Sequence, residues 1–306
     1  IAFHATLEEN LINIQNHLMH GTWQPGPYEV FEVHEPKTRT VHAPHFADRV
    51  VHHSLHAALT PIYERVFHAR SYACRVAKGT HAGADKAQQV IRQTLRKHGK
   101  AFALKADISK YFPSIDHATL KHLLRRHVPC QRTLDLCDLI VDTSPGSNGT
   151  GIPLGNLTSQ LFANIYLHEL DHFCANVLNL DGYIRYMDDF VIIWPDQSIL
   201  RDALPVIEDF LRYDLNLELN PKTQIFPIDP DGGRSVDFLG YRIYATHRRL
   251  RRRSVRKGYD YAAGYASDPT PDNLQRLTSW YAHARHAEPT GMMRRVFETI
   301  AEGRCA

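Results

Sequence analysis

Two adjacent carboxylates lie in the tetrapeptide Tyr186-Met187-Asp188-Asp189, between the apolar runs 183–184 and 190–194. These flanks predict a strand, a tight turn and a second strand. Asp is uncommon in strands, and two like charges in a poorly hydrated place raise one pKa or require a counter-charge. A divalent cation supplies such a charge. The pair therefore indicates a metal platform, and the alternative is a pair of Asp residues at an exposed hairpin turn.

Asp107 is a third carboxylate that can take part. It follows the apolar run 101–104, so it lies near the end of a predicted strand. Phosphoryl transfer with two metal ions needs carboxylates from separate elements, which hold the ions about 3.5–4 Å apart. Asp107 with Asp188 and Asp189 fits that need, and the alternative for Asp107 is a strand-end turn or a helix cap.

In their order along the chain, these segments resemble the motifs of reverse transcriptases. Asp107 matches the first catalytic motif, and residues 186–189 match the second. Asn220-Pro221-Lys222-Thr223 is similar to the lysine-bearing motif that follows, and Asp237-Phe238-Leu239-Gly240-Tyr241 is similar to the segment that supports the primer end. Four ordered motifs at plausible spacing make this resemblance specific, and it runs through most of the chain.

The segment from Gly151 to Leu161 indicates a subgroup. Reverse transcriptases of mobile introns usually have Gln-Gly, three variable residues and Ser-Pro here, whereas this chain has Leu154-Gly155 and then Ser159-Gln160. That departure resembles the enzymes of diversity-generating retroelements, as do residues 48–53, 71–75 and 282–287. The resemblance implies error-prone copying of a template-repeat RNA, with substitutions at template adenines that diversify a target gene.

The fold that the resemblance implies is an α+β, right-hand polymerase fold. Its fingers would occupy residues 1–100, with 117–150 also finger-like. The palm, an antiparallel sheet backed by helices, would occupy 101–245 and carry the catalytic Asp residues. A small, basic, helical thumb would occupy 246–306.

The sequence pattern also places the main elements. Helices are expected at 7–18, 48–65, 85–97, 120–142, 157–177, 274–286 and 292–300, and extended chain at 28–33. In the helix at 157–177, the apolar residues lie on one face, while Asn164, His168 and Asp171 face away from it.

The mechanism we expect is template-directed DNA synthesis with two Mg²⁺ ions, for which Mn²⁺ can substitute. The ions would be held by Asp107, Asp188 and Asp189 with the Ile108 carbonyl. By resemblance, Lys222 would protonate the leaving pyrophosphate and Phe112 would exclude a ribose 2′-hydroxyl, although a core Phe is the alternative for that residue. Residues expected at the nucleotide are Arg39, Arg49, Arg75, Lys78, Phe112, Leu154, Gly155 and Gln160, and those expected at the primer or nucleic acid are Tyr186, Met187, Phe238, Leu239, Gly240, Arg251, Arg252 and Arg253. For the four basic residues at the nucleotide the alternative is a solvated surface, and for Gln160 it is an ordinary position on a helix surface.

Charge is distributed unevenly along the 306 residues. Residues 246–306 hold twelve Lys and Arg against six Asp and Glu, a net charge of +6, so residues 1–245 carry −3 of the whole chain's +3. Seven of the ten residues at 248–257 are basic. This run favours nucleic-acid phosphates, and a solvated surface is the alternative.

The remaining composition limits location and partners. Five Cys residues show no CxxC spacing and an odd count, and no apolar run approaches the ~20 residues that span a bilayer. We therefore expect a reduced, cytoplasmic setting away from membranes, and the resemblance implies a protein encoded by a bacterium, an archaeon or a phage. The chain begins at Ile1 rather than Met, so the sequence leaves open whether residues precede it.

The resemblance also predicts binding partners, and two rival functions stay open. The resemblance implies template RNA, cDNA, dNTP and an oligomeric, basic accessory variability determinant as partners. Two rivals remain: a retron, intron or phage-defence reverse transcriptase of ordinary fidelity, and a noncatalytic RNA-binding scaffold. His52 and His56, at a spacing of four, fit an ordinary helix better than a zinc site.

Overall fold

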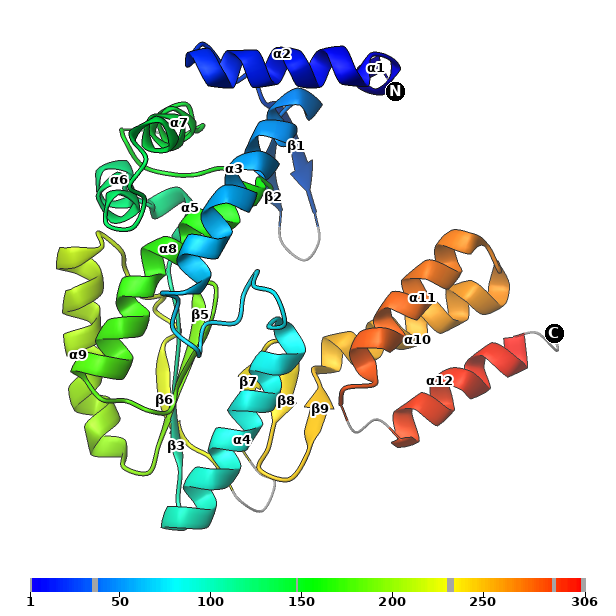
Figure 1. Ribbon diagram of the computed structural model, residues 1–306. Helices are drawn as coiled ribbons and strands as arrows, with labels where there is room; N and C mark the ends of the chain where they lie inside the picture. The colour runs from blue at the N-terminus through cyan, green and yellow to red at the C-terminus, as the bar shows by residue number, and fades with distance from the viewer. Residues whose placement is uncertain (1, 35–37, 147, 230–233, 288–289, 304–306) are drawn as a thin grey trace. The chain divides into compact units, whose positions relative to one another are not determined.

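The computed structural model describes residues 2–34, 38–146, 148–229, 234–287 and 290–303, in which helices and antiparallel strands are mixed along the chain (Figure 1). They form two compact units. Unit 1 consists of Ile1–Val76, Asp107–Asn179 and Ala203–Lys222, and unit 2 of Ala77–Ala106, Leu180–Asp202 and Thr223–Ala306. Each unit is therefore built from segments that are far apart in the sequence. The assignment of fingers, palm and thumb remains a prediction.

Unit 1 is mainly helical. Its elements are α1 (Ala2–Ala5), α2 (Leu7–His20), the hairpin of β1 (Glu29–Val33) and β2 (Arg39–Ala43), α3 (Phe46–Glu64), α5 (Tyr111–Ser114), α6 (His117–Arg125), α7 (Gln131–Asp142), α8 (Leu157–His172), the π-helical turn η1 (Phe173–Val177) and, from residue 203 onward, α9 (Gln197–Asp214). Helix α3 buries Val51, Leu55 and Leu59 at a spacing of four and packs along α8 (Figure 1).

Helix α8 is buried on nearly all sides, because α3 and α6 both pack against it. The expectation that Asn164, His168 and Asp171 face away from the core is wrong, since they are only 1%, 5% and 0% exposed. Asn164 Nδ2 donates to the Ala73 carbonyl at 2.8 Å, which satisfies an amide that would be costly to bury alone. A helix that is covered on all sides has no solvent-exposed face, so the positions of its polar residues do not predict which side chains are exposed.

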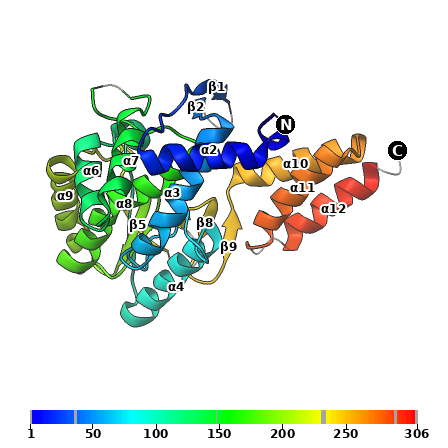
Figure 2. The same ribbon diagram turned by 45° about the horizontal axis from the view of Figure 1, so that its top comes forward.

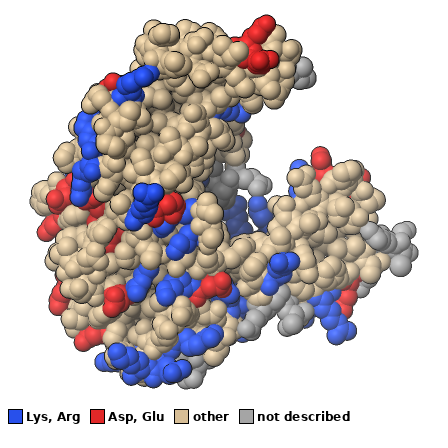
Figure 3. Space-filling model, viewed as in Figure 1, with Lys and Arg blue, Asp and Glu red and all other residues tan. Residues whose placement is uncertain are grey.

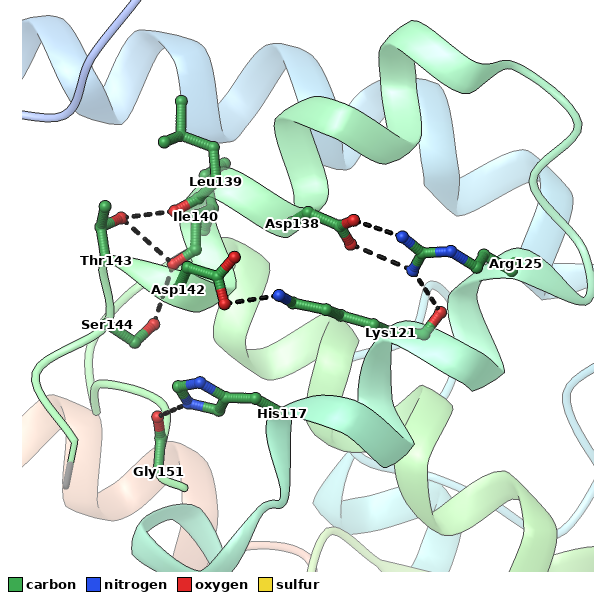
Figure 4. Close-up of polar contacts among 10 residues, drawn as sticks. All are labelled: His117, Lys121, Arg125, Asp138, Leu139, Ile140, Asp142, Thr143, Ser144 and Gly151. Atoms are coloured by element: carbon green, nitrogen blue, oxygen red, sulfur yellow. Dashed lines mark hydrogen bonds and ion pairs between the residues drawn. The ribbon is translucent and has the colours of Figure 1, made fainter. Parts of the chain in front are cut away.

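The single helix expected at 120–142 is two helices, α6 and α7. Pro129 lies between them, has no N–H for a helix bond and disfavours helical backbone in the residue before it. The two helices run antiparallel and are joined by the ion pairs Lys121–Asp142 and Arg125–Asp138 (Figure 4). At the start of α6, His117 Nε2 lies 2.8 Å from the Gly151 carbonyl, which ties α6 to the chain that leads into α8.

Unit 2 contains a four-stranded sheet in the order β4-β5-β3-β6. Its strands are β3 (Phe102–Asp107), β4 (Tyr183–Tyr186), β5 (Asp189–Trp194) and β6 (Gln224–Pro227), and α4 (Thr80–His98) packs against β4 and β5. Residues 190–193 of β5 are all buried, so both faces of this strand are covered. Gly182 lies so close to the sheet that a Cβ there would come within 1.8 Å of the Ile193 carbonyl oxygen, and only glycine fits.

The C-terminal part of unit 2 has a second sheet, in the order β7-β8-β9, and three helices. The strands are β7 (Val236–Phe238), β8 (Tyr241–Ile243) and β9 (Arg248–Leu250), and the helices are α10 (Arg252–Ser267), α11 (Pro271–Ala284) and α12 (Thr290–Gly303). Both α11 and α12 pack against α10 (Figure 2). The basic run at 248–257 therefore forms β9 and the start of α10.

Helix α10 was not expected from the sequence, because its basic start and its few apolar positions hide the helical pattern. It buries only Gly258 and Ala262. Trp280 of α11 packs over Gly258, and its indole Nε1 donates to the Ser254 carbonyl at 2.8 Å. Trp280 of α11 therefore helps to position α10, together with the packing of α12 against it. Among the described residues, no helix combines the length and the apolar composition needed to cross a membrane.

We predict opposite effects for two Gly→Ala changes within α10. A Cβ at Gly258 would lie 2.1 Å from Trp280 Cζ2, so Gly258→Ala should lower the free energy of unfolding by about 1–3 kcal/mol through overpacking. A Cβ at Gly264 meets no atom within 4 Å, so Gly264→Ala should raise it by about 0.5–1 kcal/mol. Urea denaturation of both variants tests this, and equal effects would show that Trp280 does not hold α10.

Candidate active site

The two adjacent Asp residues lie at the turn of the β4–β5 hairpin, as the sequence pattern predicts. Tyr186 of β4 pairs with Asp189 of β5, so Met187 and Asp188 form the two-residue connection. Met187 has a positive φ of 55°, which such tight hairpin turns require. Below the turn, Arg185 is completely buried and donates from NH1 to the Met187 carbonyl at 3.0 Å. The turn backbone is therefore held by a buried guanidinium.

Lys105 of β3 is a site residue that the motif analysis missed. Its Nζ lies 3.8 Å from Asp189 Oδ2 and donates to the Asp237 carbonyl at 2.5 Å. The available signal was a lone Lys within the apolar strand 102–106, two residues before Asp107 and hence on the same face of the strand. Lys105 thus aligns the last residues of β3 with the start of β5.

Asp107 is the last residue of β3, the strand beside β5 in the sheet order. In unit 1, the segment 218–222 lies alongside it. Asn220 donates from its backbone N to the Asp107 carbonyl at 2.7 Å and from Nδ2 to Asp107 Oδ2 at 3.4 Å. The Lys222 backbone N donates to Asn220 Oδ1 at 3.0 Å, and the Lys222 side chain is exposed. Asn220 therefore brings together Asp107 and the lysine-bearing motif.

Ile108, whose carbonyl is a predicted metal ligand, is buried and forms a β-bridge with Leu219. Ser109 N donates to the Glu218 carbonyl at 2.8 Å, which extends the same pairing. Phe112 follows in α5; it is half-buried and makes an edge contact with Tyr111 at 5.5 Å between ring centroids. Residues 107–112 are thus fixed by backbone pairing and by a buried aromatic neighbour.

A cavity of about 410 Å³ in unit 1 brings together three of the residues predicted at the nucleotide: Arg49, Gly155 and Gln160. Gly155 has a φ of +109°, and a Cβ there would come within 3.3 Å of Val41, so β2 approaches this turn closely. Gln160 lies in the first turn of α8, and Arg49 Nε donates to the Pro44 carbonyl at 2.9 Å. The cavity joins the β1–β2 hairpin, the start of α3 and the start of α8.

Other residues predicted at the nucleotide lie elsewhere. Leu154 is half-buried just before Gly155 but does not line the cavity, and Arg39 is exposed at the start of β2. Lys78 belongs to unit 2, ahead of α4.

Arg75, which is also predicted at the nucleotide, makes contacts that stabilise the fold. It is 6% exposed, forms an ion pair with Glu64 at 2.8 Å and donates from NH1 to the His68 and Ser71 carbonyls. Its guanidinium also lies over the Phe67 ring. Nε, both N–H groups of NH1 and one N–H group of NH2 are thus engaged within the protein, and a contact between Arg75 and the triphosphate stays a prediction.

The two His residues at a spacing of four in α3 have separate partners, as an ordinary helix predicts. His52 Nδ1 lies 2.6 Å from Thr158 Oγ1, and burial lowers the pKa of His52. His56 Nδ1 lies 3.2 Å from Thr60 Oγ1. The bond to Thr158 attaches α3 to the first turn of α8, beside the cavity.

The segment 237–241 forms a second tight turn, between β7 and β8. Leu239 and Gly240 have positive φ values of 55° and 87°, and Phe238 is completely buried. A Cβ at Gly240 would lie 3.2 Å from His283 Nε2, and the Tyr241 hydroxyl donates to the His283 carbonyl at 2.9 Å. The turn is therefore fixed against α11.

A cluster of imidazoles surrounds Tyr241. His81 stacks on His286 with 3.7 Å between ring centroids, and the Tyr241 hydroxyl lies 3.0 Å from His81 Nδ1. Burial, with help from the neighbouring imidazoles, lowers the pKa of both His81 and His283. His81 and His283 therefore favour the neutral form, which reduces charge repulsion among the clustered rings.

The predicted nucleic-acid residues at 251–253 are not equivalent. Arg251 Nε contacts Asp237 Oδ1 at 2.5 Å, so Arg251 supports the 237–241 turn, whereas Arg252 and Arg253 are exposed. A separate group of Lys and Arg gathers at the C-terminal end of α4 (Figure 3), where Arg96 and Lys97 lie in the last turn. Cations are favoured there by the helix dipole, which explains that group without a ligand.

Comparisons with known proteins identify the family of the chain. The family model described as reverse transcriptase (RNA-dependent DNA polymerase) matches residues 33–243. Protein YkfC of Escherichia coli K12 is 26% identical over 286 residues, which cover 78% of this chain and 72% of YkfC. The group II intron-encoded protein LtrA of Lactococcus lactis is 29% identical over 251 residues, which cover 78% of this chain and 41% of LtrA.

Solved structures show the same fold. Telomerase from Candida albicans, in complex with a fragment of telomeric RNA, has a TM-score of 0.55 at 12% identity, covering 84% of this chain and 55% of that one. Apo telomerase from Candida tropicalis has a TM-score of 0.54 at 12% identity, covering 97% and 62%. The chain spans less than two thirds of LtrA and of these telomerases. Because the family model covers more than half of it, this chain belongs to the reverse transcriptases, the RNA-dependent DNA polymerases, and has their right-hand polymerase fold.

Proposed function

We propose that this chain synthesises DNA on an RNA template, with Asp107, Asp188 and Asp189 holding two Mg²⁺ ions. The observation that carries the proposal is the β4–β5 hairpin, which has Asp188 in its connection and Asp189 at the start of β5. Strand β5 is next to β3, whose last residue is Asp107. Three carboxylates from two neighbouring strands match what two-metal phosphoryl transfer needs. The family membership of the chain points to the same chemistry.

The donor set fits Mg²⁺ better than it fits a closed metal cage. Within the described part of the chain, no three His, Cys, Asp or Glu side chains are arranged to hold an ion by themselves. Mg²⁺ is usually held by one or two carboxylates, water and substrate phosphates, so carboxylates from separate strands with the Ile108 carbonyl suit a site completed by dNTP. When bound, the ions would activate the primer 3′-hydroxyl and offset charge on the transferred phosphate.

The surrounding residues then have positioning roles. Lys105 holds Asp189 and the Asp237 carbonyl, and Asn220 holds Asp107. Lys222 would donate a proton to the leaving pyrophosphate. Tyr186, whose hydroxyl accepts from Thr80 Oγ1 at 3.4 Å, would with Met187 contact the primer.

The cavity that contains Arg49, Gly155 and Gln160 is our site for part of the incoming nucleotide. Arg49 offers a guanidinium, which matches phosphate oxygens bidentately. Arg39 and Lys78 remain proposed phosphate contacts, and Phe112 remains the proposed filter against a ribose 2′-hydroxyl. Residues 1–100 with 117–150, 101–245 and 246–306 remain our proposed fingers, palm and thumb.

Within the family, we place the chain in the diversity-generating retroelement group, which copies template-repeat RNA with errors at adenines. The support is Leu154 where related enzymes carry a polar Gln, and Gln160 in place of the helix-starting Pro. Leu cannot hydrogen-bond the substrate, so less transition-state binding depends on a correct base pair. The basic accessory variability determinant belongs to this proposal. The similarity to LtrA favours the rival, an intron-type enzyme of ordinary fidelity.

The catalytic assignment predicts that Asp188→Asn keeps the fold and lowers DNA synthesis by orders of magnitude, because two-metal clamping supplies much of the barrier reduction. Primer extension on an RNA template measures the loss, and EDTA should stop the wild type until Mg²⁺ is restored. Asp196→Asn, at an exposed turn, is the control and should extend normally. Near wild-type extension by folded Asp188→Asn would remove these carboxylates from the site.

The contacts of Lys105 predict two effects of Lys105→Met. The concentration of Mg²⁺ for half-maximal activity should fall, because a cation 3.8 Å from Asp189 no longer competes with the metal. The maximal rate should fall by about tenfold, because the Asp237 carbonyl loses a charged donor. Lys86→Met, which loses a surface bond to Gln89, is the matched control. A Mg²⁺ titration that superimposes on that of the wild type would exclude this role.

The fidelity proposal predicts that the wild type misincorporates mainly opposite template adenine and that Leu154→Gln lowers this error rate without abolishing synthesis. Each ~1.4 kcal/mol of added discrimination would reduce errors by about tenfold. Sequencing of cDNA from a defined RNA, with and without a basic accessory protein, measures both. Few errors in the wild type, spread evenly over the four template bases, would return the chain to reverse transcriptases of ordinary fidelity.

A further inference from the structure

A cavity of about 460 Å³ in unit 2 lies among β8, β9, α10 and α12 and combines basic and apolar walls. Its basic side has four arginines, and its apolar side is formed by buried Leu250 and Ala287 with Val255, Tyr259 and Met292. The arginines are Arg242, Arg249, Arg252 and Arg295. The volume lies within the range of about 300–1,000 Å³ that is typical of small-ligand pockets.

The arginines are placed in an electrostatically unfavourable way. Arg242 of β8 is the direct cross-strand partner of Arg249 of β9, and both guanidiniums lie over Tyr244, at 5.9 and 5.6 Å from its ring centroid. Like charges directly opposite each other destabilise an antiparallel pair. An anion between or beside them would turn this repulsion into attraction.

Among the described residues, no carboxylate forms an ion pair with Arg242 or Arg249 that would take the place of that anion. The ion pairs of this region are formed by Arg248 with Asp85, Arg251 with Asp237 and Arg294 with Glu298. Arg242, Arg249 and Arg252 are not among them, and Arg249 and Arg252 are exposed. Arg249 and Arg252 therefore face solvent, and within the described part of the chain no ion pair joins either of them to a carboxylate.

We propose that this cavity binds one nucleotide of a single-stranded nucleic acid, with its base against the apolar side and its phosphates on Arg249 and Arg252. A double helix presents mainly phosphates and would leave the apolar wall unused, whereas an unstacked base has a face that packs on Tyr259, Leu250 and Met292. An acidic protein segment would use the charge of the arginines but leave the apolar side of the cavity unfilled. The inference rests on the proposed function, because that activity brings RNA and cDNA to the chain.

Gly291 allows the cavity to be filled without a change of charge. It is the second residue of α12, it lines the cavity, and a Cβ there meets no atom within 4 Å. Gly291→Leu should therefore fold normally, since Leu favours helix more than Gly does. Gly264→Leu in α10 is the matched control, because a Cβ there also meets no atom within 4 Å and Gly264 does not line the cavity.

The experiment measures binding of short, labelled, single-stranded RNA, the same sequence as DNA, and the blunt duplex, by fluorescence anisotropy over a range of salt. Gly291→Leu should weaken single-strand binding by about tenfold and leave duplex binding unchanged. Replacing Arg249 and Arg252 by Gln should flatten the salt dependence by roughly 0.7 in slope for each lost phosphate contact. Arg294→Gln, outside the cavity, should keep the wild-type slope. Stronger binding of the RNA or of the DNA identifies which strand occupies the cavity.

Wild-type affinity of folded Gly291→Leu for both single strands would overturn the proposal. So would competition by polyglutamate as effective as that by RNA, because the site would then read charge alone. Thermal unfolding by circular dichroism confirms that each variant is folded. Failure of the wild type to extend a primer, with cavity-dependent oligonucleotide binding intact, would instead overturn the proposed function.

Discussion

Mutual repulsion between Asp188 and Asp189 is the constraint on which the organisation of unit 2 depends. Two carboxylates at the turn of a buried hairpin need nearby positive charge to stay ionised and well placed. Two cations of the chain address this need: buried Arg185 holds the turn backbone, and Lys105 approaches Asp189. Lys105 also donates a hydrogen bond to the Asp237 carbonyl, so the residue that offsets the negative charge of the hairpin also contacts the 237–241 turn.

That linkage continues into the small sheet and the helices of unit 2. Asp237 is paired with Arg251 at the start of α10, and Tyr241 is bonded to His81 of α4 and His283 of α11. A change at the hairpin can therefore reach α10 and α11 through a short series of polar contacts. In unit 1, the corresponding element is Asn220, which joins Asp107 to the segment of Lys222.

The arginines of the C-terminal region fall into two groups with different physical roles. Arg248, Arg251 and Arg294 neutralise carboxylates and stabilise local packing, and their partial exposure keeps each contribution small. Arg242, Arg249 and Arg252 gather at one cavity with an apolar wall. The net charge of +6 in residues 246–306 therefore overstates the surface available to nucleic acid, since part of it is spent within the protein.

The sequence by itself determined the family, the hairpin with its two Asp residues and most of the long helices, because these depend on local patterns: alternating apolar runs, turn residues and ordered motifs. It did not determine the break between α6 and α7, the existence of α10 or the burial of Asn164, His168 and Asp171. Each of these depends on which element covers which face. Arg75 and Lys105 show the same limit at the level of side chains. A sequence gives the charge of these two side chains, but only the fold decides that Arg75 contacts Glu64 and that Lys105 contacts Asp189. The reason is that each partner lies elsewhere in the chain and competes with solvent and substrate for the same N–H donors.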